Sequence, residues 1–229
     1  VLPSRSKFIY LPVNIPDGLS NTVFDRELIR RKYNLPKNFL FYATQLRPYK
    51  NVPLVLKAIA YLKKTGQEMS LVLTGYPDSD PECARIIRSS NLEASVVSIG
   101  TVDDQDLYRL YDAALGVVVP SLFEGGFPWQ ACEALFMNKP LALSDIPVSV
   151  ERIEFHGFTK QSSGLLFFDP GSVESCADAI SRLITDPVRI CQSQDAFRKE
   201  FLKYSWQDAA DVYYNTMNSV LSNPGISLD

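Results

Sequence analysis

Two carboxylates and a pair of glycines stand close together near the middle of the chain. Glu124 is followed directly by Gly125 and Gly126, and Glu133 comes after eight intervening residues. A carboxylate accepts two hydrogen bonds, so vicinal sugar hydroxyls are natural partners for such a pair. Adjacent glycines permit a close approach of a ligand to the backbone. The segment predicts a sugar-binding loop; the alternative is that Glu124 is a turn residue and Glu133 complements a helix dipole.

Two cations lie in an earlier loop, which runs from Thr44 to Asn51 and contains no glycine. Arg47 and Lys50 stand just before a predicted helix, and fixed cations beside a helix amino end are suited to phosphate oxygens. Two solvated surface cations are the alternative interpretation. A dinucleotide-binding fold would carry G-x-G-x-x-G at this place, so the loop argues against NAD or FAD bound in that mode.

A third source of phosphate contacts is the helix predicted after the paired glycines, from about Trp129 to Met137. Its early residues Gln130, Ala131 and Cys132 are predicted to present free backbone N–H groups, because the first turn of a helix has no acceptors for them. Backbone amides and cations beside carboxylates suit a ligand that combines phosphate with sugar. The sequence therefore favours a sugar nucleotide.

Six short apolar runs follow one another from residue 39 onward. They alternate with segments of helical period, of which Asp103–Ala114 is one. Continuous apolar runs are typical of strands covered on both faces, so the alternation predicts a doubly wound, Rossmann-like α/β fold with a parallel sheet and helices on both faces. Ligands of such sheets bind beyond the carboxyl ends of the strands. The predicted strands are Phe39–Thr44, Ser70–Thr74, Val96–Ile99, Leu115–Val119, Pro140–Ser144 and Gly164–Phe168.

Helix signals flank these strands. Asn51 is a predicted N-cap with Pro53 in the first turn, and Ser172 precedes another amphipathic helix. A closing helix carries an apolar stripe from Trp206 to Val220. Such a stripe is expected to be buried against another surface.

The chain divides into three predicted parts, residues 1–38, 39–205 and 206–229. The first is an interdomain linker with a short strand at Lys7–Leu11 and a short helix at Asp25–Lys32. The second is the α/β domain that binds the ligand, and the third is a helix and tail. A length of 229 residues agrees with one domain and its appendages, since domains average about 150 residues.

Composition argues against several function classes. The formal net charge of −3 argues against nucleic-acid binding through a broad positive face. The longest apolar stretches are far shorter than the roughly 18 residues of a membrane helix. Four cysteines without a C-x-x-C pair indicate reduced thiols in a cytosolic protein. The single histidine, His156, excludes a multi-histidine metal site, and alone it poorly supplies a catalytic triad or an epimerase acid–base pair.

From about Leu35 to Val220, these segments resemble the retaining GT-B glycosyltransferases of family 4. The resemblance rests on the order and spacing of the motifs rather than on any one of them. The matching segments are FLFYATQLRPYKN (39–51), LVLTG (71–75), SIGTV (98–102), VPSLFEGG (119–126), KPLALSDIP (139–147), GLLFFDP (164–170) and YSW (204–206).

The resemblance implies a role for individual residues. In that family the carboxyl-terminal Rossmann-like domain binds the sugar nucleotide, and Lys50 matches the lysine that meets its diphosphate. Glu124 matches the first glutamate of the E-x7-E motif, which contacts the transferred sugar, and Glu133 corresponds to the second, which holds the ribose. Lys50 and Glu124 are thus the expected catalytic residues. Further donor contacts are expected from Gln45, Arg47, Gly100, Thr101, Val102, Gly125, Gly126, Phe127, Gln130, Ala131 and Cys132, with residues 100–102 beside the base and 130–132 near phosphate.

Two departures from the family pattern stand out. Gln45 occupies a place where the family usually has an arginine, so one diphosphate cation is missing unless Arg47 replaces it. Glu124 and Glu133 are separated by eight residues instead of seven, which bears on the role of Glu133. These departures support an alternative function, a non-catalytic nucleotide-sugar-binding or scaffold module of a larger assembly.

The implied activity is transfer of a sugar from a UDP-, GDP- or ADP-sugar to a glycan or lipid-linked acceptor, with retention of configuration and without a metal or other cofactor. A complete enzyme of this type, as in polysaccharide biosynthesis, has an acceptor-binding domain ahead of the donor-binding one. We therefore expect such a domain before Val1 and expect the present chain to be inactive alone. The expected location is cytoplasmic, with peripheral association of the full enzyme at the cytoplasmic membrane face.

Overall fold

The computed structural model describes residues 9–13 and 24–222, and its centre is one six-stranded sheet. All five strand pairs are parallel, and the strand order is β3-β2-β1-β4-β5-β6. The doubly wound parallel sheet is confirmed, and all six predicted strands are present, each one or two residues shorter than predicted. The strands are β1 (Phe39–Tyr42), β2 (Ser70–Leu73), β3 (Val96–Ser98), β4 (Gly116–Val119), β5 (Leu141–Ser144) and β6 (Leu166–Phe168).

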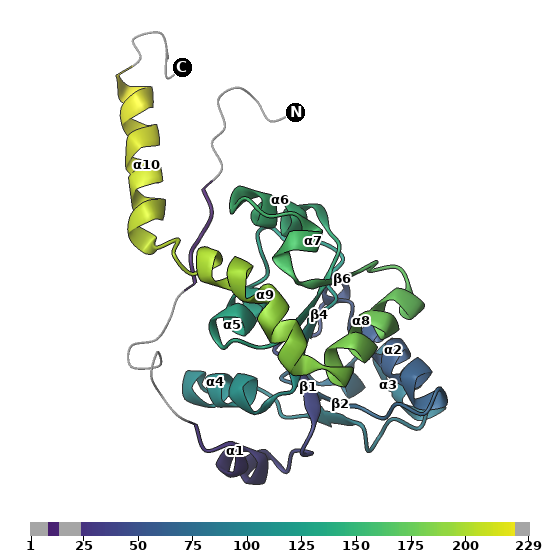
Figure 1. Ribbon diagram of the computed structural model, residues 1–229. Coiled ribbons are helices and arrows are strands. Elements are labelled where there is room, and N and C mark those ends of the chain that lie inside the picture. Colours follow the sequence, from purple (N-terminus) through teal and green to yellow (C-terminus); the bar gives the residue numbers. More distant parts are fainter. Residues whose placement is uncertain (1–8, 14–23, 223–229) are drawn as a thin grey trace.

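Helices cover both faces of the sheet (Figure 1). Helix α8 packs on α2, which also packs on α3, whereas α5 packs on β4, β5 and α4. The helices are α1 (Arg26–Tyr33), α2 (Val52–Lys64), α3 (Pro81–Ser89), α4 (Asp104–Ala113), α5 (Trp129–Phe136), α6 (Pro147–Phe155), α7 (Lys160–Ser163), α8 (Val173–Thr185), α9 (Pro187–Phe201) and α10 (Trp206–Leu221), with two 3-10 turns, η2 (Pro48–Lys50) and η3 (Pro77–Ser79).

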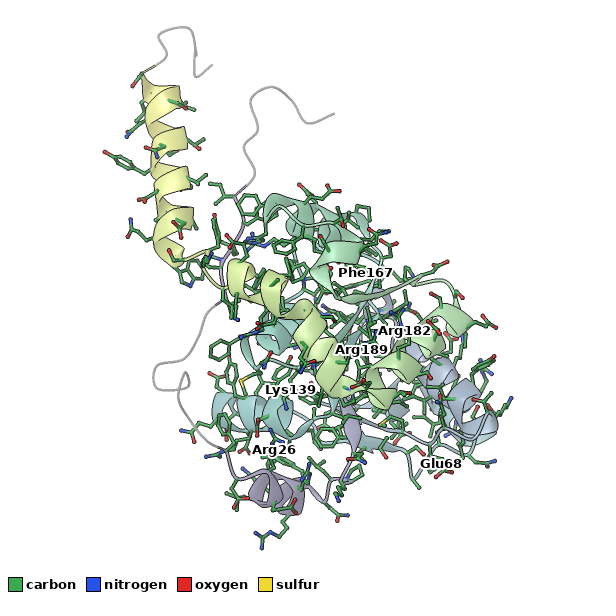
Figure 2. The ribbon with its side chains drawn as sticks, in the orientation of Figure 1. Arg26, Glu68, Lys139, Phe167, Arg182 and Arg189 are labelled. Carbon is green, nitrogen blue, oxygen red and sulfur yellow. The ribbon has the colours of Figure 1, made fainter. Side chains whose placement is uncertain are left out.

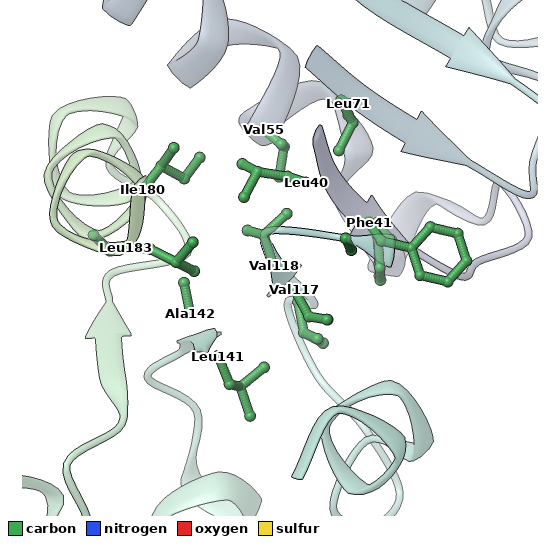
Figure 3. Close-up of a cluster of buried hydrophobic side chains, with 14 of the residues drawn as sticks. Leu40, Phe41, Val55, Leu71, Val117, Val118, Leu141, Ala142, Ile180 and Leu183 are labelled. Atoms are coloured by element: carbon green, nitrogen blue, oxygen red, sulfur yellow. The ribbon is translucent and has the colours of Figure 1, made fainter. Parts of the chain in front are cut away.

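The strands are apolar throughout because neighbouring side chains on a strand point to opposite, equally buried faces. Leu40 lies beside Val55 of α2 and close to α8 (Figure 3). Phe41 points the other way and packs edge-to-face against Tyr111 of α4, with ring centroids 5.0 Å apart. At Gly116, a Cβ atom would lie 2.4 Å from Leu183 of α8. Glycine thus allows α8 to approach β4 closely.

The lead-in helix α1 belongs to the body of the protein. Asp25 caps it by accepting from two backbone N–H groups, and Ile29 is buried in the core. Arg26 holds Asp112 of α4 through two hydrogen bonds of 2.7 and 3.0 Å. The short strand predicted at Lys7–Leu11 is not found: residues 9–11 form no strand, and residues 7 and 8 lie outside the described part.

Helix α10 extends away from the body (Figure 1). The expectation that its apolar stripe is buried is wrong for the described residues, because Trp206, Tyr213, Met217 and Val220 are all exposed. Of the whole helix, only Ala209 is buried. No helix in the described part of the chain is both long and apolar enough to cross a membrane.

Candidate functional site

Two loops meet where the strand order reverses. β1 and β4 are neighbours, but the chain leaves β1 toward β2 and β4 toward β5, which lie on opposite sides. The crevice beyond the carboxyl ends of strands at such a point is where open α/β sheets bind ligands. Lys50 belongs to the loop after β1, and Glu124 to the loop after β4. The two residues predicted as catalytic therefore share this crevice.

The two loops are joined to each other by backbone, ring and side-chain contacts. The Leu122 amide donates to the Tyr49 carbonyl at 2.8 Å, and the rings of Tyr49 and Phe123 lie 4.9 Å apart. The Asn51 side-chain amide donates to the carbonyls of Pro120 and Pro170, at 3.1 and 2.9 Å. The loops after β1, β4 and β6 thus form one connected rim.

Asn51 does not act as the side-chain cap that the sequence suggests. It occupies the N-cap position of α2, but its side chain makes no capping hydrogen bond, because the amide is used to bind the two neighbouring loops. Its φ of 52° lies in the left-handed region, which asparagine tolerates better than most residues. This backbone turn redirects the chain directly after Lys50.

Lys50 and Glu124 form an ion pair at the centre of the crevice. The Lys50 ammonium lies 2.6 Å from Glu124 Oε1, and both side chains are largely shielded from water. Ser121 Oγ donates to the same carboxylate oxygen at 2.7 Å, and the Tyr42 hydroxyl donates to the Lys50 carbonyl at 3.1 Å. Both charged groups are therefore held in place before any ligand binds.

Two cavities open on either side of this ion pair and share Lys50, Trp129 and Gln130. The first, cavity 1, has a volume of about 390 Å³, and the second, cavity 2, of about 490 Å³. Cavity 1 is also lined by Glu124, Gly125, Gly126, Phe127, Pro128, Cys132, Arg152 and residues 9–11. Cavity 2 is also lined by Ala43, Thr44, Gln45, Arg47, Tyr49, Thr74, Thr101, Val102, Leu107 and Glu133.

The two predicted carboxylates do not converge on one cavity. Glu124 lines cavity 1 and Glu133 lines cavity 2, because the intervening residues carry the chain over the first turn of α5. The Tyr111 hydroxyl donates to Glu133 Oε2 at 2.6 Å, and burial raises the pKa of the Glu133 carboxyl. A ligand that meets both carboxylates must extend through both cavities.

The N-terminus of α5 offers fewer free N–H groups than the sequence suggests. The Ala131 and Cys132 amides both donate to the Pro128 carbonyl, at 2.9 and 3.1 Å, and both residues are buried. Their predicted contact with phosphate is therefore not available in this conformation. The Gln130 side chain instead donates to the Ala43 carbonyl at 2.8 Å and ties α5 to the end of β1.

The remaining predicted donor-binding residues each line one of the two cavities, with the exception of Gly100. Arg47 donates to the Gln45 side chain at 3.1 Å, so this cation is tethered at the wall of cavity 2. A Cβ atom at Gly125 or Gly126 would meet nothing within 4 Å, which leaves their backbone open to cavity 1. Gly100 lines neither cavity, although the next two residues, 101 and 102, line cavity 2.

Several site residues were not predicted. Trp129 forms a wall common to both cavities and is half-exposed. Ser121 and Tyr111 each hold one of the two glutamates. Trp129 follows the Gly-Gly turn closely and is the first residue of α5, and this position is a signal that could have identified it. The contact of Tyr111 depends instead on the packing of α4 against α5.

Among the described residues, metal-ligand clusters, thiols and the single histidine provide no second reactive site. No cluster of three or more potential metal ligands exists among the residues that the structure describes. All four cysteines are free thiols, as expected, and burial raises the pKa of Cys132 to about 12. His156 lines neither cavity, and burial lowers its pKa to about 4.

The chain is similar to known glycosyltransferases in both sequence and structure. The family model for glycosyl transferases group 1 matches residues 25–203. The lipopolysaccharide 1,2-N-acetylglucosaminetransferase of Salmonella typhimurium is 24% identical over 217 residues, which cover 90% of this chain and 56% of that enzyme. The chain thus spans little more than half the length of this relative.

Solved structures share the fold. A glycosyltransferase from Rickettsia africae is 17% identical with a TM-score of 0.70, over 86% of this chain and 52% of that one. The carboxyl-terminal domain of a glycosyl transferase group 1 family protein from Francisella tularensis is 18% identical with a TM-score of 0.62. That alignment covers 88% of this chain and 98% of the Francisella domain.

Proposed function

Because the chain belongs to the glycosyl transferases of group 1, we propose that it binds a nucleotide sugar across its two cavities and acts as the donor-binding part of a retaining sugar transferase. The observation that carries this proposal is the Lys50–Glu124 ion pair, which stands at the strand-order reversal and at the junction of the two cavities. One ligand can therefore place a diphosphate at Lys50, with a sugar on one side and a nucleoside on the other.

The lining of each cavity supports this orientation of the donor. Cavity 1 offers the Glu124 carboxylate and the open backbone of Gly125 and Gly126, which suit sugar hydroxyls. Cavity 2 offers the Glu133 carboxylate for ribose hydroxyls and Val102 for the flat face of a base. The nucleotide is proposed to be a UDP, GDP or ADP group.

The chemical step requires stabilisation of the departing nucleoside diphosphate. Lys50 is the proposed principal cation, and Arg47 substitutes for the cation that Gln45 does not provide. Loss of one such preorganised charge typically costs about 3 kcal/mol in the barrier. We assign no covalent nucleophile, since the proposed role of Glu124 is to accept hydrogen bonds from sugar hydroxyls while Ser121 holds its carboxylate. The C1–oxygen bond to the diphosphate breaks, the acceptor hydroxyl oxygen bonds to C1 on the face that the diphosphate leaves, and its proton passes to the departing phosphate oxygen. Configuration is thereby retained, and the proposal includes no metal.

The acceptor is proposed to be a growing surface polysaccharide or its lipid-linked precursor. This part of the proposal is supported by the lipopolysaccharide acceptor in the name of the Salmonella relative. Since the chain covers 56% of that enzyme, we place acceptor binding in a further domain. The present chain alone is then expected to bind donors without transferring sugar.

Isothermal titration calorimetry with UDP-, GDP- and ADP-hexoses tests the donor site. We expect one nucleotide class to bind the 229-residue chain, and Lys50→Ala to weaken that binding about 10- to 100-fold, since a hydrogen bond to a charged group contributes about 1.5–3 kcal/mol. Glu124→Gln is expected to reduce the affinity for the nucleotide sugar more than that for the bare nucleoside diphosphate.

Lys57→Ala provides the matched control, because Lys57 forms a comparable 2.8 Å ion pair with Glu82 at the protein surface. Its affinity for the donor should equal that of the unmodified chain. Failure of all three nucleotide classes to bind, or equal effects of Lys50→Ala and Lys57→Ala, would reject the proposed donor site and favour a scaffold.

A further inference from the structure

Arg152 of α6 is a buried cation that has no counter-charge among the described residues. Its side chain is only 1% exposed, and none of its three guanidinium nitrogens has a hydrogen-bond partner among the described residues. Nor does it form an ion pair with any carboxylate in residues 9–13 and 24–222. Burial of an unpaired charge costs several kcal/mol, so a native protein retains one only where something else compensates for it.

Aromatic rings surround the guanidinium but do not satisfy its N–H groups. Its central carbon lies 4.6 Å from the ring centroid of Tyr10 and 5.1 Å from those of Phe201 and Tyr204, with Phe155 at 5.4 Å. Ring faces attract a cation electrostatically. They fix the position of the charge, but the N–H donors of the guanidinium still lack an acceptor within the described part of the chain.

The same side chain lines cavity 1, together with Glu124 and the paired glycines. We propose that cavity 1 receives a sugar that carries a carboxylate, and that Arg152 binds this carboxylate. The inference rests on the proposed function, because it specifies the sugar that occupies the sugar side of the donor site. Arg152 is thereby a specificity-determining residue, since a neutral sugar leaves its charge unpaired.

A carboxylate suits this position better than a phosphate. One guanidinium carries one positive charge and presents two parallel N–H groups, which match the two oxygens and single charge of a carboxylate. A phosphate monoester carries up to two negative charges and would need a second cation. The nearest other cation that lines cavity 1 is Lys50, which is already paired with Glu124.

Tyr10 lies over one face of the guanidinium and also lines cavity 1. The three nitrogens are closed off from water in this conformation, so the carboxylate reaches them when the Tyr10 ring moves aside. A water-excluded guanidinium forms a stronger ion pair than a solvated one, because the local dielectric constant is low. The recognition is therefore expected to be selective as well as tight.

Matched pairs of ligands that differ by one carboxylate test the proposal on the 229-residue chain. Calorimetry compares UDP-glucuronate with UDP-glucose, GDP-mannuronate with GDP-mannose and ADP-glucuronate with ADP-glucose. We expect the carboxylated member to bind at least about tenfold more tightly than its neutral partner, within the nucleotide class that the chain binds.

Arg152→Met is expected to reduce that affinity ratio to about one. Arg182→Met, which removes an exposed arginine of α8 that does not line cavity 1 (Figure 2), is expected to keep the ratio. A ratio near one for the unmodified chain in the nucleotide class that it binds, or a ratio that survives in Arg152→Met, overturns the inference. The affinity ratio of the unmodified chain tests the inference even if Arg152→Met does not fold. Binding of neutral donors without a carboxylate preference rejects this inference alone, whereas no binding of any nucleotide sugar rejects the proposed function with it.

Discussion

The Lys50–Glu124 ion pair holds two opposite charges that a donor would need separately. The two groups neutralise each other at a distance of 2.6 Å. On the proposed function, a diphosphate competes for Lys50, and the Glu124 carboxylate then exchanges its ion pair for hydrogen bonds from sugar hydroxyls. Ser121 keeps its hydrogen bond to the carboxylate meanwhile and holds it in place. Donor binding and exposure of the sugar-binding carboxylate are then a single event.

His156 should make the stability of the protein depend on pH. Its ring lies among Phe155, Phe201 and Tyr204, and its Nε2 atom is buried without a partner among the described residues. Burial, followed by the nearby charge of Arg152, lowers its pKa from 6.5 to about 4. Between these two values the unfolded chain binds the proton and the folded chain does not. Stability should therefore fall as the pH drops from about 6.5 to 4, by an amount on the order of 2 kcal/mol, because the partial exposure of His156 reduces the full effect of the shift.

Urea denaturation of the unmodified chain and of His156→Phe across this pH range isolates the effect. Carboxylates titrate in both proteins, so only the difference between the two curves belongs to His156. We expect the free energy of unfolding of the variant to decline less steeply toward pH 4. Parallel curves would show that the buried imidazole does not resist protonation.

At the scale of the elements, Asn51 is expected to position the loop that carries Lys50. Asn51→Ala removes two hydrogen bonds to neighbouring loops and places alanine at a positive φ. We expect a loss of about 2 kcal/mol in the free energy of unfolding. Donor affinity should fall about tenfold, because the Lys50 loop loses its anchor to the loops after β4 and β6. Denaturation and calorimetry measure the two effects.

Asn91 offers a matched control for this substitution. It has the same φ of 52° but lies exposed, away from both cavities. Asn91→Ala should cost only the backbone strain, about 1 kcal/mol, and should leave donor affinity unchanged. Equal effects of the two substitutions on donor affinity would mean that Asn51 does not position Lys50.

The strands were readable from the sequence because burial on both faces demands uninterrupted apolar runs. Helices α3, α6 and α9 were not anticipated, although each begins with a proline, at Pro81, Pro147 and Pro187. Proline is favoured in the first helical turn, and Asp80 and Asp186 cap two of these helices. Signals for the start of these helices were therefore present in the sequence.

The site was predictable where it depends on loops directly after strands, as for Lys50 and Glu124. It was not predictable where a side chain acts across elements. Glu133 is held by Tyr111 of another helix, and Asn51 joins two loops distant in sequence. Arg152 carries no local pattern at all, since only the folded chain reveals a cation without a partner.

At the scale of the whole molecule, α10 is an appendage that contributes little to the stability of the described body. Only Ala209 of this helix is buried, and Trp206, Tyr213 and Met217 are exposed. Deletion of residues 206–229 keeps Tyr204, which stacks on Arg152. We expect the shortened chain to unfold cooperatively in urea, with its free energy of unfolding lowered by less than about 1 kcal/mol, as for changes at exposed sites. A loss of several kcal/mol would show that α10 packs on the body in solution, and an unchanged value would leave the exposed stripe free to bind another domain.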